Sequence, residues 1–210
     1  TDDEILDINK LSKAGRGYKA DCKIKMKETG KIWNCSIKSK NGADFAILNH
    51  TPRSAKVFKE NGNLYENLSY LDITIKEYKD KRKSNKIGQD TSINNLECLK
   101  SNNTLKEKFK NVLKYFVFNG TGSGYSKCKA NSIIEYQNDK ITFTRCDTEE
   151  EKKKYIESIY HKIIISFRDK NMPNAKRESD CEYCKPWIFE DIQSDGSIKL
   201  KGSLHIRVKN

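Results

Sequence analysis

Apolar and polar residues alternate along two neighbouring stretches near the start of the chain. Residues 20–26 and 33–38 place an apolar side chain at every second position, which is the period of a half-buried β-strand. The segment 28–31 between them, Glu-Thr-Gly-Lys, has the composition of a turn, so the pattern predicts a β-hairpin. If Thr29-Gly30 is a two-residue turn, Asp21 faces Lys38 on the polar side of this hairpin.

Helix and strand patterns are mixed through the rest of the chain. Helices are predicted at an amphipathic segment and after two capping boxes: at 2–13, from Thr104 (with Glu107) and from Thr148 (with Glu151). Strands that pair as hairpins are predicted at 132–136, 141–144, 187–192 and 197–208. Loops are predicted at 80–86, which is basic, and at 120–124, which is rich in glycine. The mixture predicts an α+β (mixed α/β) fold.

Charge narrows the class of partner. Lys and Arg number 41 against 29 Asp and Glu, so the formal net charge is +12. Such an excess favours a polyanion, above all nucleic acid, although many lysines also simply solubilise a surface. With 210 residues the chain has the length of one domain.

The apolar pattern also bears on the compartment. No apolar run reaches the roughly 18 residues of a membrane span, and no secretory signal is visible near the start. The seven cysteines are therefore expected to be free thiols, and the protein to be cytoplasmic. Cys181 and Cys184 form a CxxC motif, but a zinc site needs further ligands, for which Cys128 and Cys146 are the candidates.

The facing pair of Asp21 and Lys38 suits phosphodiester hydrolysis. A carboxylate holds Mg²⁺, with waters and a backbone carbonyl as the remaining ligands. A neighbouring ammonium orients the attacking water and stabilises the developing negative charge. The alternative is an ordinary cross-strand ion pair, which contributes a few tenths of a kcal/mol.

Two segments at this hairpin resemble a nuclease signature. They are 17–21, Gly-Tyr-Lys-Ala-Asp, and 36–42, Ser-Ile-Lys-Ser-Lys-Asn-Gly, and together they resemble the pattern written PD…(D/E)xK. They are most similar to type II restriction endonucleases of the HpaII/MspI group, in which a strand with KxD precedes a strand that ends in SIKS. The segment 46–51, Ala-Ile-Leu-Asn-His-Thr, extends the resemblance, which covers about residues 13–51.

The resemblance implies a role for each residue of the signature. It makes Asp21 the metal-binding carboxylate and Lys38 the catalytic lysine, and the carbonyl of Ile37 completes the Mg²⁺ site. Ser36 stands where the second carboxylate is usual, which suits one Mg²⁺ with more water ligands. Asp44, after the second strand, and Glu4 or Asp7, on the predicted first helix, are candidates for the missing carboxylate. Glu28 is a further acid of this hairpin, but it lies in the turn, too far from Lys38.

The resemblance also implies a fold and a division of the chain. The fold is a restriction-endonuclease-like central mixed sheet flanked by helices, in a single nuclease domain over 1–210. The catalytic core spans about 1–78, and DNA-binding elements and C-terminal strands span about 79–210.

A nuclease of this kind must position phosphates and read base edges, and four surfaces are candidates. The first follows the catalytic strand, with Lys40, Asn41, Asn49, His50 and Arg53. The second is the basic segment with Lys81 and Arg82, and the third is the glycine-rich loop with Tyr125 and Lys127. The fourth is the polar side of the last strand, with Lys201, Ser203, His205 and Arg207. A solvated charge run, or the wet side of a half-buried strand, explains the second and fourth equally well.

We therefore expect a Mg²⁺-dependent, sequence-specific endonuclease that cuts double-stranded DNA, of the type II restriction class. Such an enzyme acts as a monomer or homodimer on DNA in a prokaryotic cytoplasm, without a membrane. It belongs to a restriction-modification system, whose DNA methyltransferase is present in the host and is not a physical partner. The alternatives are a structure-specific repair or junction nuclease of the same fold, and a DNA-binding module without catalysis.

Overall fold

The computed structural model describes residues 5–10, 18–49, 62–121, 124–168, 185–192, 194–196 and 198–210. Contacts divide the chain into two compact units, and each is described by itself. The first unit comprises Thr1–Phe45, Lys114–Ser158 and Asn210, and the second comprises Ala46–Leu113 and Ile159–Lys209. Helices and multi-stranded sheets occur together, so the predicted α+β class is confirmed. None of the helices in the described ranges is long and apolar enough to span a membrane.

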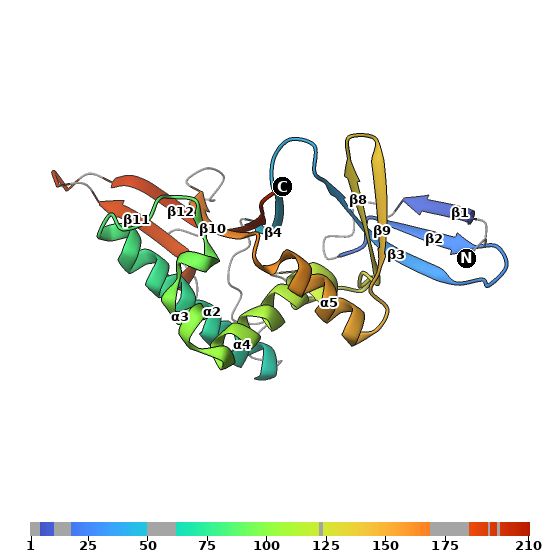
Figure 1. The fold of residues 1–210 in the computed structure, drawn as a ribbon, viewed down its shortest axis with the longest axis horizontal. Helices are drawn as coiled ribbons and strands as arrows, with labels where there is room; N and C mark the ends of the chain where they lie inside the picture. The colour runs from blue at the N-terminus through green and yellow to red at the C-terminus, as the bar shows by residue number, and fades with distance from the viewer. Residues whose placement is uncertain are drawn as a thin grey trace. The chain divides into compact units, whose positions relative to one another are not determined.

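The first unit is built on a mixed five-stranded sheet. Its order is β1-β2-β3-β8-β9, in which β3 and β8 run parallel and the other neighbours antiparallel (Figure 1). The bounds of its strands are Ile5–Lys10 for β1, Cys22–Met26 for β2, Ile32–Ser39 for β3, Ser132–Gln137 for β8 and Lys140–Arg145 for β9. The sheet that carries the predicted catalytic pair therefore takes two strands from beyond residue 78.

The predicted hairpin at 20–38 is present, but its register differs from the prediction. Cys22 pairs with Cys35 and Lys23 pairs with Asn34, where the two-residue turn had placed Lys23 opposite Ser36. The connection is longer, because the Met26 N–H donates to the Lys31 carbonyl at 2.9 Å and closes a loop over 27–30. A shift of two residues keeps each side chain on its predicted face, since strand side chains alternate with a period of two. The prediction that Lys38 directly faces Asp21 is wrong: the strand pairing ends at Cys22 and Cys35, and Asp21 forms hydrogen bonds with Cys35, Ser36 and Ile37.

The helix predicted at 2–13 is wrong where the chain is described. Residues 5–10 form β1, which pairs antiparallel with β2 and sets Ile8 opposite Ile24. The apolar spacing of this short segment fits a helix or a strand, and pairing with a neighbouring strand decides between them.

Two predicted elements of the first unit are confirmed. β8 and β9 form the predicted hairpin, and Asn138 and Asp139 at its turn have φ of 48° and 61°, as a type I′ turn requires. α5 (Glu149–Tyr160) begins at the predicted capping box. The Glu151 N–H donates to Thr148 Oγ1 at 3.1 Å, and the Thr148 N–H donates to Glu151 Oε2 at 3.0 Å.

One face of this sheet carries a small apolar core. Cys22, Ile24, Trp33 and Cys35 are buried there, and Phe143 of β9 packs edge-on against Trp33 with ring centroids 5.4 Å apart. The opposite face carries the odd-numbered residues of β2 and the even-numbered residues of β3, which include Ser36 and Lys38, and Asp21 lies just before β2. The hairpin thus separates an apolar face from the face of the candidate site.

The second unit contains another five-stranded sheet, of order β11-β12-β10-β5 with β4 beside β12. The bounds are Phe45–Asn49 for β4, Thr91–Ser92 for β5, Ile163–Arg168 for β10, Ile188–Ile192 for β11 and Ile198–Val208 for β12. β11 and β12 form the hairpin predicted at the end of the chain. Short 3-10 helices, η1 (Ile93–Asn95) and η3 (Lys185–Trp187), precede α3 and β11.

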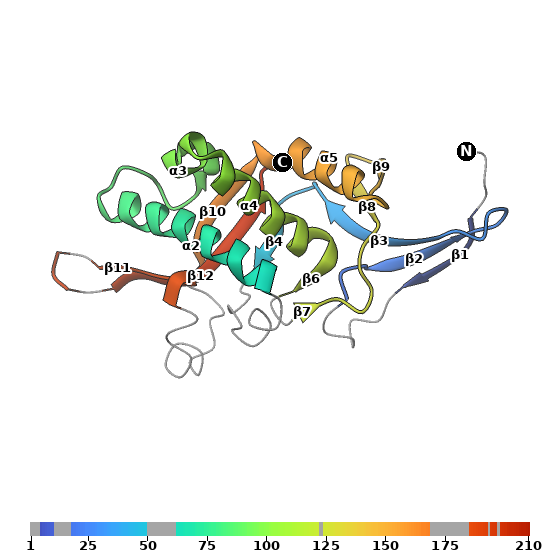
Figure 2. The ribbon, with the colours of Figure 1, turned by 90° about the horizontal axis from the view of Figure 1, so that it is seen from below.

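α2 (Gly62–Lys83) runs along this sheet and was not predicted (Figure 2). Its buried residues Leu68, Leu71, Ile75 and Tyr78 recur at helical spacing, and the ring of Tyr78 lies 5.5 Å from that of Phe167 on β10. The predicted loop at 80–86 is wrong for 80–83, because the helix continues to Lys83. Its last turn is basic, which complements the negative end of the helix dipole.

The remaining helices connect the two units along the chain. α3 (Glu97–Ser101) is followed by α4 (Asn103–Lys114), the helix predicted from Thr104. The capping residue differs from the prediction, because the Leu105 N–H donates to Asn102 Oδ1 at 2.9 Å. α4 continues into a π-helical turn, η2 (Tyr115–Asn119), and the predicted loop at 120–124 is a short hairpin of β6 (Gly120–Thr121) and β7 (Gly124–Tyr125).

Candidate active site

Asp21 lies at the bend where the chain enters β2, and its carboxylate is held by the opposite strand. Oδ2 accepts hydrogen bonds from the Ile37 N–H at 2.7 Å and from Ser36 Oγ at 3.3 Å. The Asp21 N–H donates to the Cys35 carbonyl at 2.7 Å. Backbone and side chain of Asp21 are thus both fixed against β3, which orients the carboxylate.

Side-chain burial along β3 departs from simple alternation next to this carboxylate. Trp33 and Cys35 are buried as predicted, but Ser36 is only 1% exposed and Ile37 is 47% exposed. A buried hydroxyl is costly unless it is hydrogen-bonded, and Ser36 meets this need by donating to Asp21. At Ile37 the contact shown is made by the N–H, so the predicted role of its carbonyl stays a prediction.

Lys38 lies on the same face as Ser36, one alternation further along β3. Its side chain is half-buried, with Nζ 5.9 Å from the centre of the Phe45 ring. Burial lowers the pKa of Lys38, and the negative charge of Asp21 opposes this shift. The structure therefore brings Asp21, Ser36 and Lys38 together, although Asp21 and Lys38 are not directly opposite.

Lys19 also interacts with this cluster and was not predicted as a site residue. Burial is the main cause that lowers its pKa to about 8, the charge of Lys38 adds to the shift, and Asp21 opposes it. Its backbone is anchored, since the Lys19 N–H donates to Ser126 Oγ at 2.9 Å and to the Cys128 carbonyl at 3.1 Å. Its place in the structure depends on these contacts with residues 107 and more positions later in the chain, which no local pattern shows.

Glu135 of β8 lies next to Lys38 in the parallel register, but it is engaged elsewhere. Its Oε2 accepts from Lys40 Nζ at 2.8 Å, and its Oε1 accepts from the Tyr155 hydroxyl at 3.3 Å. Burial, together with the charge of Glu135, raises the pKa of Tyr155. Lys40, predicted to contact DNA, is therefore part of an ion pair between β3 and β8.

The donor set fits a magnesium ion bound through one carboxylate. Mg²⁺ commonly keeps several waters and takes one or two protein carboxylates, and Asp21 supplies one. Among the described residues no group of three or more His, Cys, Asp or Glu side chains is gathered for a metal. Asp44 accepts a hydrogen bond from the Asn210 N–H at 3.1 Å, and Asp7 lies on β1 opposite Lys25.

The loop after β7 joins the site through its backbone contacts. Ser126 is 6% exposed, and its Oγ accepts from the N–H groups of Lys19 and Cys128 and donates to the Cys128 carbonyl at 2.8 Å. Tyr125 beside it is 49% exposed and meets Tyr115 edge-on at 5.2 Å. Lys127 and Lys129 are exposed, and Lys129 Nζ lies 5.2 Å from the Tyr125 ring centre. Tyr125 and Lys127, predicted to bind DNA, thus border the candidate site.

Asn41, the other predicted DNA contact after β3, is tied to the neighbouring hairpin. Its Oδ1 accepts from the Asn138 N–H at 2.9 Å, at the β8–β9 turn. This hydrogen bond occupies the side-chain oxygen of Asn41, and the residue is nevertheless exposed on the surface.

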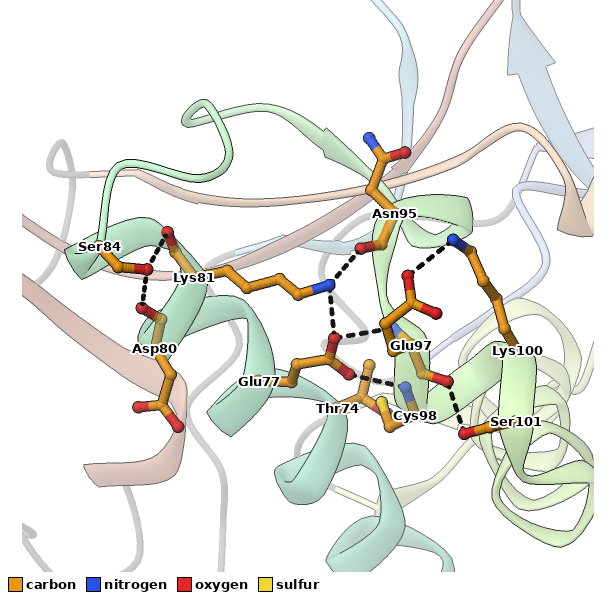
Figure 3. Close-up of polar contacts among 10 residues, drawn as sticks. All are labelled: Thr74, Glu77, Asp80, Lys81, Ser84, Asn95, Glu97, Cys98, Lys100 and Ser101. Atoms are coloured by element: carbon orange, nitrogen blue, oxygen red, sulfur yellow. Dashed lines mark hydrogen bonds and ion pairs between the residues drawn. The ribbon is translucent and has the colours of Figure 1, made fainter.

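The second unit holds the other predicted DNA residues, and three of them have structural contacts. Lys81 Nζ lies 2.8 Å from Glu77 Oε1 and donates to the Asn95 carbonyl at 2.8 Å (Figure 3). Arg207 pairs with Asp90 at 2.7 Å. His205 is 5% exposed, with Leu204 and Ile206 buried on either side. The prediction of a wet face along β12 is wrong over 204–206, because the sheet is covered on both sides there.

Other predicted site residues are not placed at side-chain level. Arg82 is half-buried in the last turn of α2. Asn49 ends β4, and Lys201 and Ser203 lie within β12, where only the backbone is described. His50, Arg53, Glu4, Cys181 and Cys184 lie outside the described residues.

The candidate site was compared with known proteins only through the chain as a whole, and its description rests on its geometry. No protein-family model, curated protein or solved structure matches the chain.

Proposed function

We propose that the protein is a Mg²⁺-dependent, sequence-specific endonuclease that cuts double-stranded DNA, of the type II restriction class. The observation that carries the proposal is the fixed carboxylate of Asp21 with Lys38 on the same sheet face. The resemblance of 17–21 and 36–42 to the nuclease signature supports it, and so does the net charge of +12. The mixed sheet beneath the site is compatible with the restriction-endonuclease-like fold that the resemblance implies.

Each residue of the cluster has a defined task in this proposal. Asp21 is the residue to hold Mg²⁺, which supplies a Lewis acid and a more acidic bound water. The Ile37 N–H and Ser36 Oγ orient the Asp21 carboxylate from β3. Lys38 donates to the attacking water or to a phosphate oxygen and stabilises the negative charge that develops there. Its partial burial strengthens this interaction, since electrostatic attraction grows as water is excluded.

The exposed residues beside the cluster suit the DNA backbone. Lys127 and Lys129 carry positive charge, and Tyr125 offers a partly exposed ring to a base or sugar. Ser126 accepts a hydrogen bond from the Lys19 N–H. Because Lys19 is two residues before Asp21, this hydrogen bond links the loop to the chain beside Asp21. Such contacts hold a DNA strand in position, whereas recognition of the base sequence needs side chains that reach the base edges in the grooves.

Ser36 favours one alternative, a DNA-binding module that has lost catalysis. A serine hydroxyl binds Mg²⁺ more weakly than a carboxylate, and here it is already engaged with Asp21. Such a module keeps affinity for duplex DNA and shows no metal-dependent cutting.

The test is cleavage of plasmid DNA by the purified chain in Mg²⁺, against EDTA and Asp21→Asn. We expect the parent protein to produce discrete fragments in Mg²⁺. No fragments should appear in EDTA or with Asp21→Asn. Glu28→Gln, which removes a carboxylate from the exposed turn of the same hairpin, is the matched control and should cut like the parent. Sequencing the fragment ends then gives the recognition site and the stagger together.

The outcomes separate the candidates. Cutting only at nicks, mismatches or junctions would assign a structure-specific nuclease instead. Duplex binding without any cutting in Mg²⁺ would assign the binding module and reject the enzyme. Cutting by Asp21→Asn at the parent rate would reject the site described here.

A further inference from the structure

Ser126 is a buried serine whose hydroxyl joins two distant segments of backbone. It is 6% exposed, and its Oγ accepts from the N–H groups of Lys19 and Cys128 at 2.9 and 3.0 Å. The same hydroxyl donates to the Cys128 carbonyl at 2.8 Å. A serine hydroxyl has one donor and two acceptor sites, so these three hydrogen bonds use its whole capacity and fix its orientation.

The segment that carries Ser126 is itself held at the end of η2. The Ser126 N–H donates to the Asn119 carbonyl at 2.8 Å, and the Ala130 N–H donates to the Phe118 carbonyl at 2.9 Å. Phe118 and Ala130 are both buried. Backbone groups that are buried and hydrogen-bonded in this way open rarely, so Ser126 has a stable base.

The chain that leads into β2 depends on this base. Residues 18–20 have no regular secondary structure, so no ladder of strand hydrogen bonds holds them. The Lys19 N–H is instead shared between Ser126 Oγ and the Cys128 carbonyl, at 2.9 and 3.1 Å, and the Ala20 N–H donates to the same carbonyl at 3.2 Å. Because Ser126 also bonds the N–H and the carbonyl of Cys128, it fixes the main acceptor of this segment as well.

Asp21 follows directly and is held from the other side by β3. Its N–H donates to the Cys35 carbonyl at 2.7 Å, and its Oδ2 accepts from the Ile37 N–H at 2.7 Å. A carboxylate that binds a metal depends on the groups that orient it, and loss of one such group commonly weakens metal binding about 10- to 100-fold. The loop at 126–128 is therefore placed to influence the candidate metal site without touching the metal.

We propose that Ser126 is a positioning residue of the candidate site. Its hydroxyl holds the segment before Asp21 at the place from which the carboxylate meets the Ile37 N–H and binds the metal. The inference rests on the proposed function for the metal. It adds a residue to which neither the nuclease signature nor the net charge assigns a role.

The test compares Ser126→Ala with Ser132→Ala. Ser132 is another buried serine of the first unit, and its Oγ lies 3.3 Å from the Asn34 carbonyl and 3.1 Å from Cys35 Sγ. It pairs with Cys35, whose side chain is on the apolar face of the sheet, away from the candidate site. Ser132→Ala is therefore a matched control for the loss of one buried hydroxyl.

Three quantities are measured for the parent and for each variant. The first is hydrogen exchange of the Ile37 amide, followed by NMR, which reports on the hydrogen bond to Asp21 without metal or DNA. The second is the dissociation constant of Mn²⁺, a paramagnetic probe of the Mg²⁺ site, measured by electron paramagnetic resonance with Asp21→Asn as the blank. The third is the Mg²⁺ concentration that gives half-maximal single-turnover cleavage of duplex DNA.

In Ser126→Ala the Ile37 amide should exchange faster than in the parent, because the carboxylate that accepts from it is less well held. The dissociation constant of Mn²⁺ and the half-maximal Mg²⁺ concentration should both rise about 10-fold. Ser126→Thr, which keeps the hydroxyl, should recover part of both losses. Ser132→Ala should match the parent in all three measurements, although both alanine variants should lower the unfolding midpoint.

Two results would overturn the inference. The first is a Ser126→Ala protein with the Ile37 exchange rate and the Mn²⁺ affinity of the parent. The second is an equal change in Ser126→Ala and Ser132→Ala, which would assign the effect to the loss of any buried hydroxyl. Failure of the proposed function has a different signature, in which the parent cuts no DNA in Mg²⁺ and binds Mn²⁺ no better than Asp21→Asn. In that case the exchange of the Ile37 amide still decides whether Ser126 holds Asp21 in place.

Discussion

Two clusters of lysine and carboxylate in this molecule differ in how their charges are balanced. In the second unit, the Glu77 carboxylate accepts from the N–H groups of Glu97 and Cys98 at 2.7 and 2.8 Å and pairs with Lys81 (Figure 3). These hydrogen bonds outweigh the effect of burial and lower the pKa of Glu77 to about 2. In the first unit, Asp21 interacts electrostatically with both Lys19 and Lys38, and burial lowers the pKa of both lysines.

The two clusters differ in which groups satisfy the carboxylate. Around Glu77 the groups satisfy one another: the carboxylate caps the start of α3 from α2, and Lys81 also donates to the Asn95 carbonyl. Around Asp21 the carboxylate accepts hydrogen bonds from Ile37 and Ser36, and Lys19 and Lys38 interact with it electrostatically. Groups in both clusters have shifted pKa values, so a shift alone does not distinguish the clusters. The charges and hydrogen-bond donors around each carboxylate do distinguish them.

Lys38→Ala tests the cluster around Asp21. We expect single-turnover cleavage of DNA to fall about 100- to 1,000-fold, because a donor to transition-state charge is lost. Duplex affinity measured with Ca²⁺ in place of Mg²⁺ should change only a few-fold. Lys25→Ala, an exposed lysine of β2, is the control, and equal rates for the two variants would refute the role of Lys38.

Glu77→Ala tests the balanced cluster. It leaves two N–H groups without their acceptor and removes the carboxylate that pairs with Lys81, so we expect the free energy of unfolding to fall by about 2–3 kcal/mol. Urea titration at pH 7 measures this change. Cleavage per folded molecule should stay at the parent value, and a fall in that quantity would contradict a purely structural role for Glu77.

Acid should remove the contribution of Glu77. Its pKa is lowered from 4.5 to about 2, so the stabilisation is complete above pH 4.5 and is lost as the pH falls towards 2. The difference in unfolding free energy between the parent and Glu77→Gln should therefore shrink over this range. A difference that stays constant between pH 5 and pH 2.5 would mean that the carboxylate charge is not what stabilises α3.

The smallest effect is expected one turn further along the same helix. Lys76 and Asp80 form an exposed ion pair at 2.6 Å, with side chains 78% and 60% exposed. Asp80→Asn should change the free energy of unfolding by no more than about 0.5 kcal/mol, since such pairs are screened by water. A loss as large as that of Glu77→Ala would show that the contacts to the N–H groups of α3 are not the reason for the difference.

Local patterns predicted the elements whose determinants are local. The β8–β9 hairpin follows from Asn138-Asp139 between alternating segments, and α5 follows from Thr148 and Glu151, because each signal lies within a few residues. The hairpin of the candidate site was predicted as well, together with Asp21, Ser36 and Lys38 on one face. Its register was not, because the turn uses residues 27–30 rather than Thr29-Gly30 alone.

Contacts between distant residues account for what the sequence missed. β1 resembles a helix until it pairs with β2, and α2 has only a narrow apolar stripe among its charged residues. The position of Lys19 depends on its contact with Ser126, 107 positions later in the chain. The signature alone therefore does not predict the contacts of Lys19.

That long separation has a consequence for the order of folding. The β2–β3 hairpin closes a short loop, whereas the parallel pairing of Cys35 with Ser132 joins residues 97 positions apart and costs more chain entropy. During synthesis, Asp21 and Lys38 emerge early, but Lys19 finds its acceptors only when Ser126 and Cys128 have left the ribosome. A growing chain that ends before residue 126 therefore carries both signature residues without the backbone anchor for Lys19.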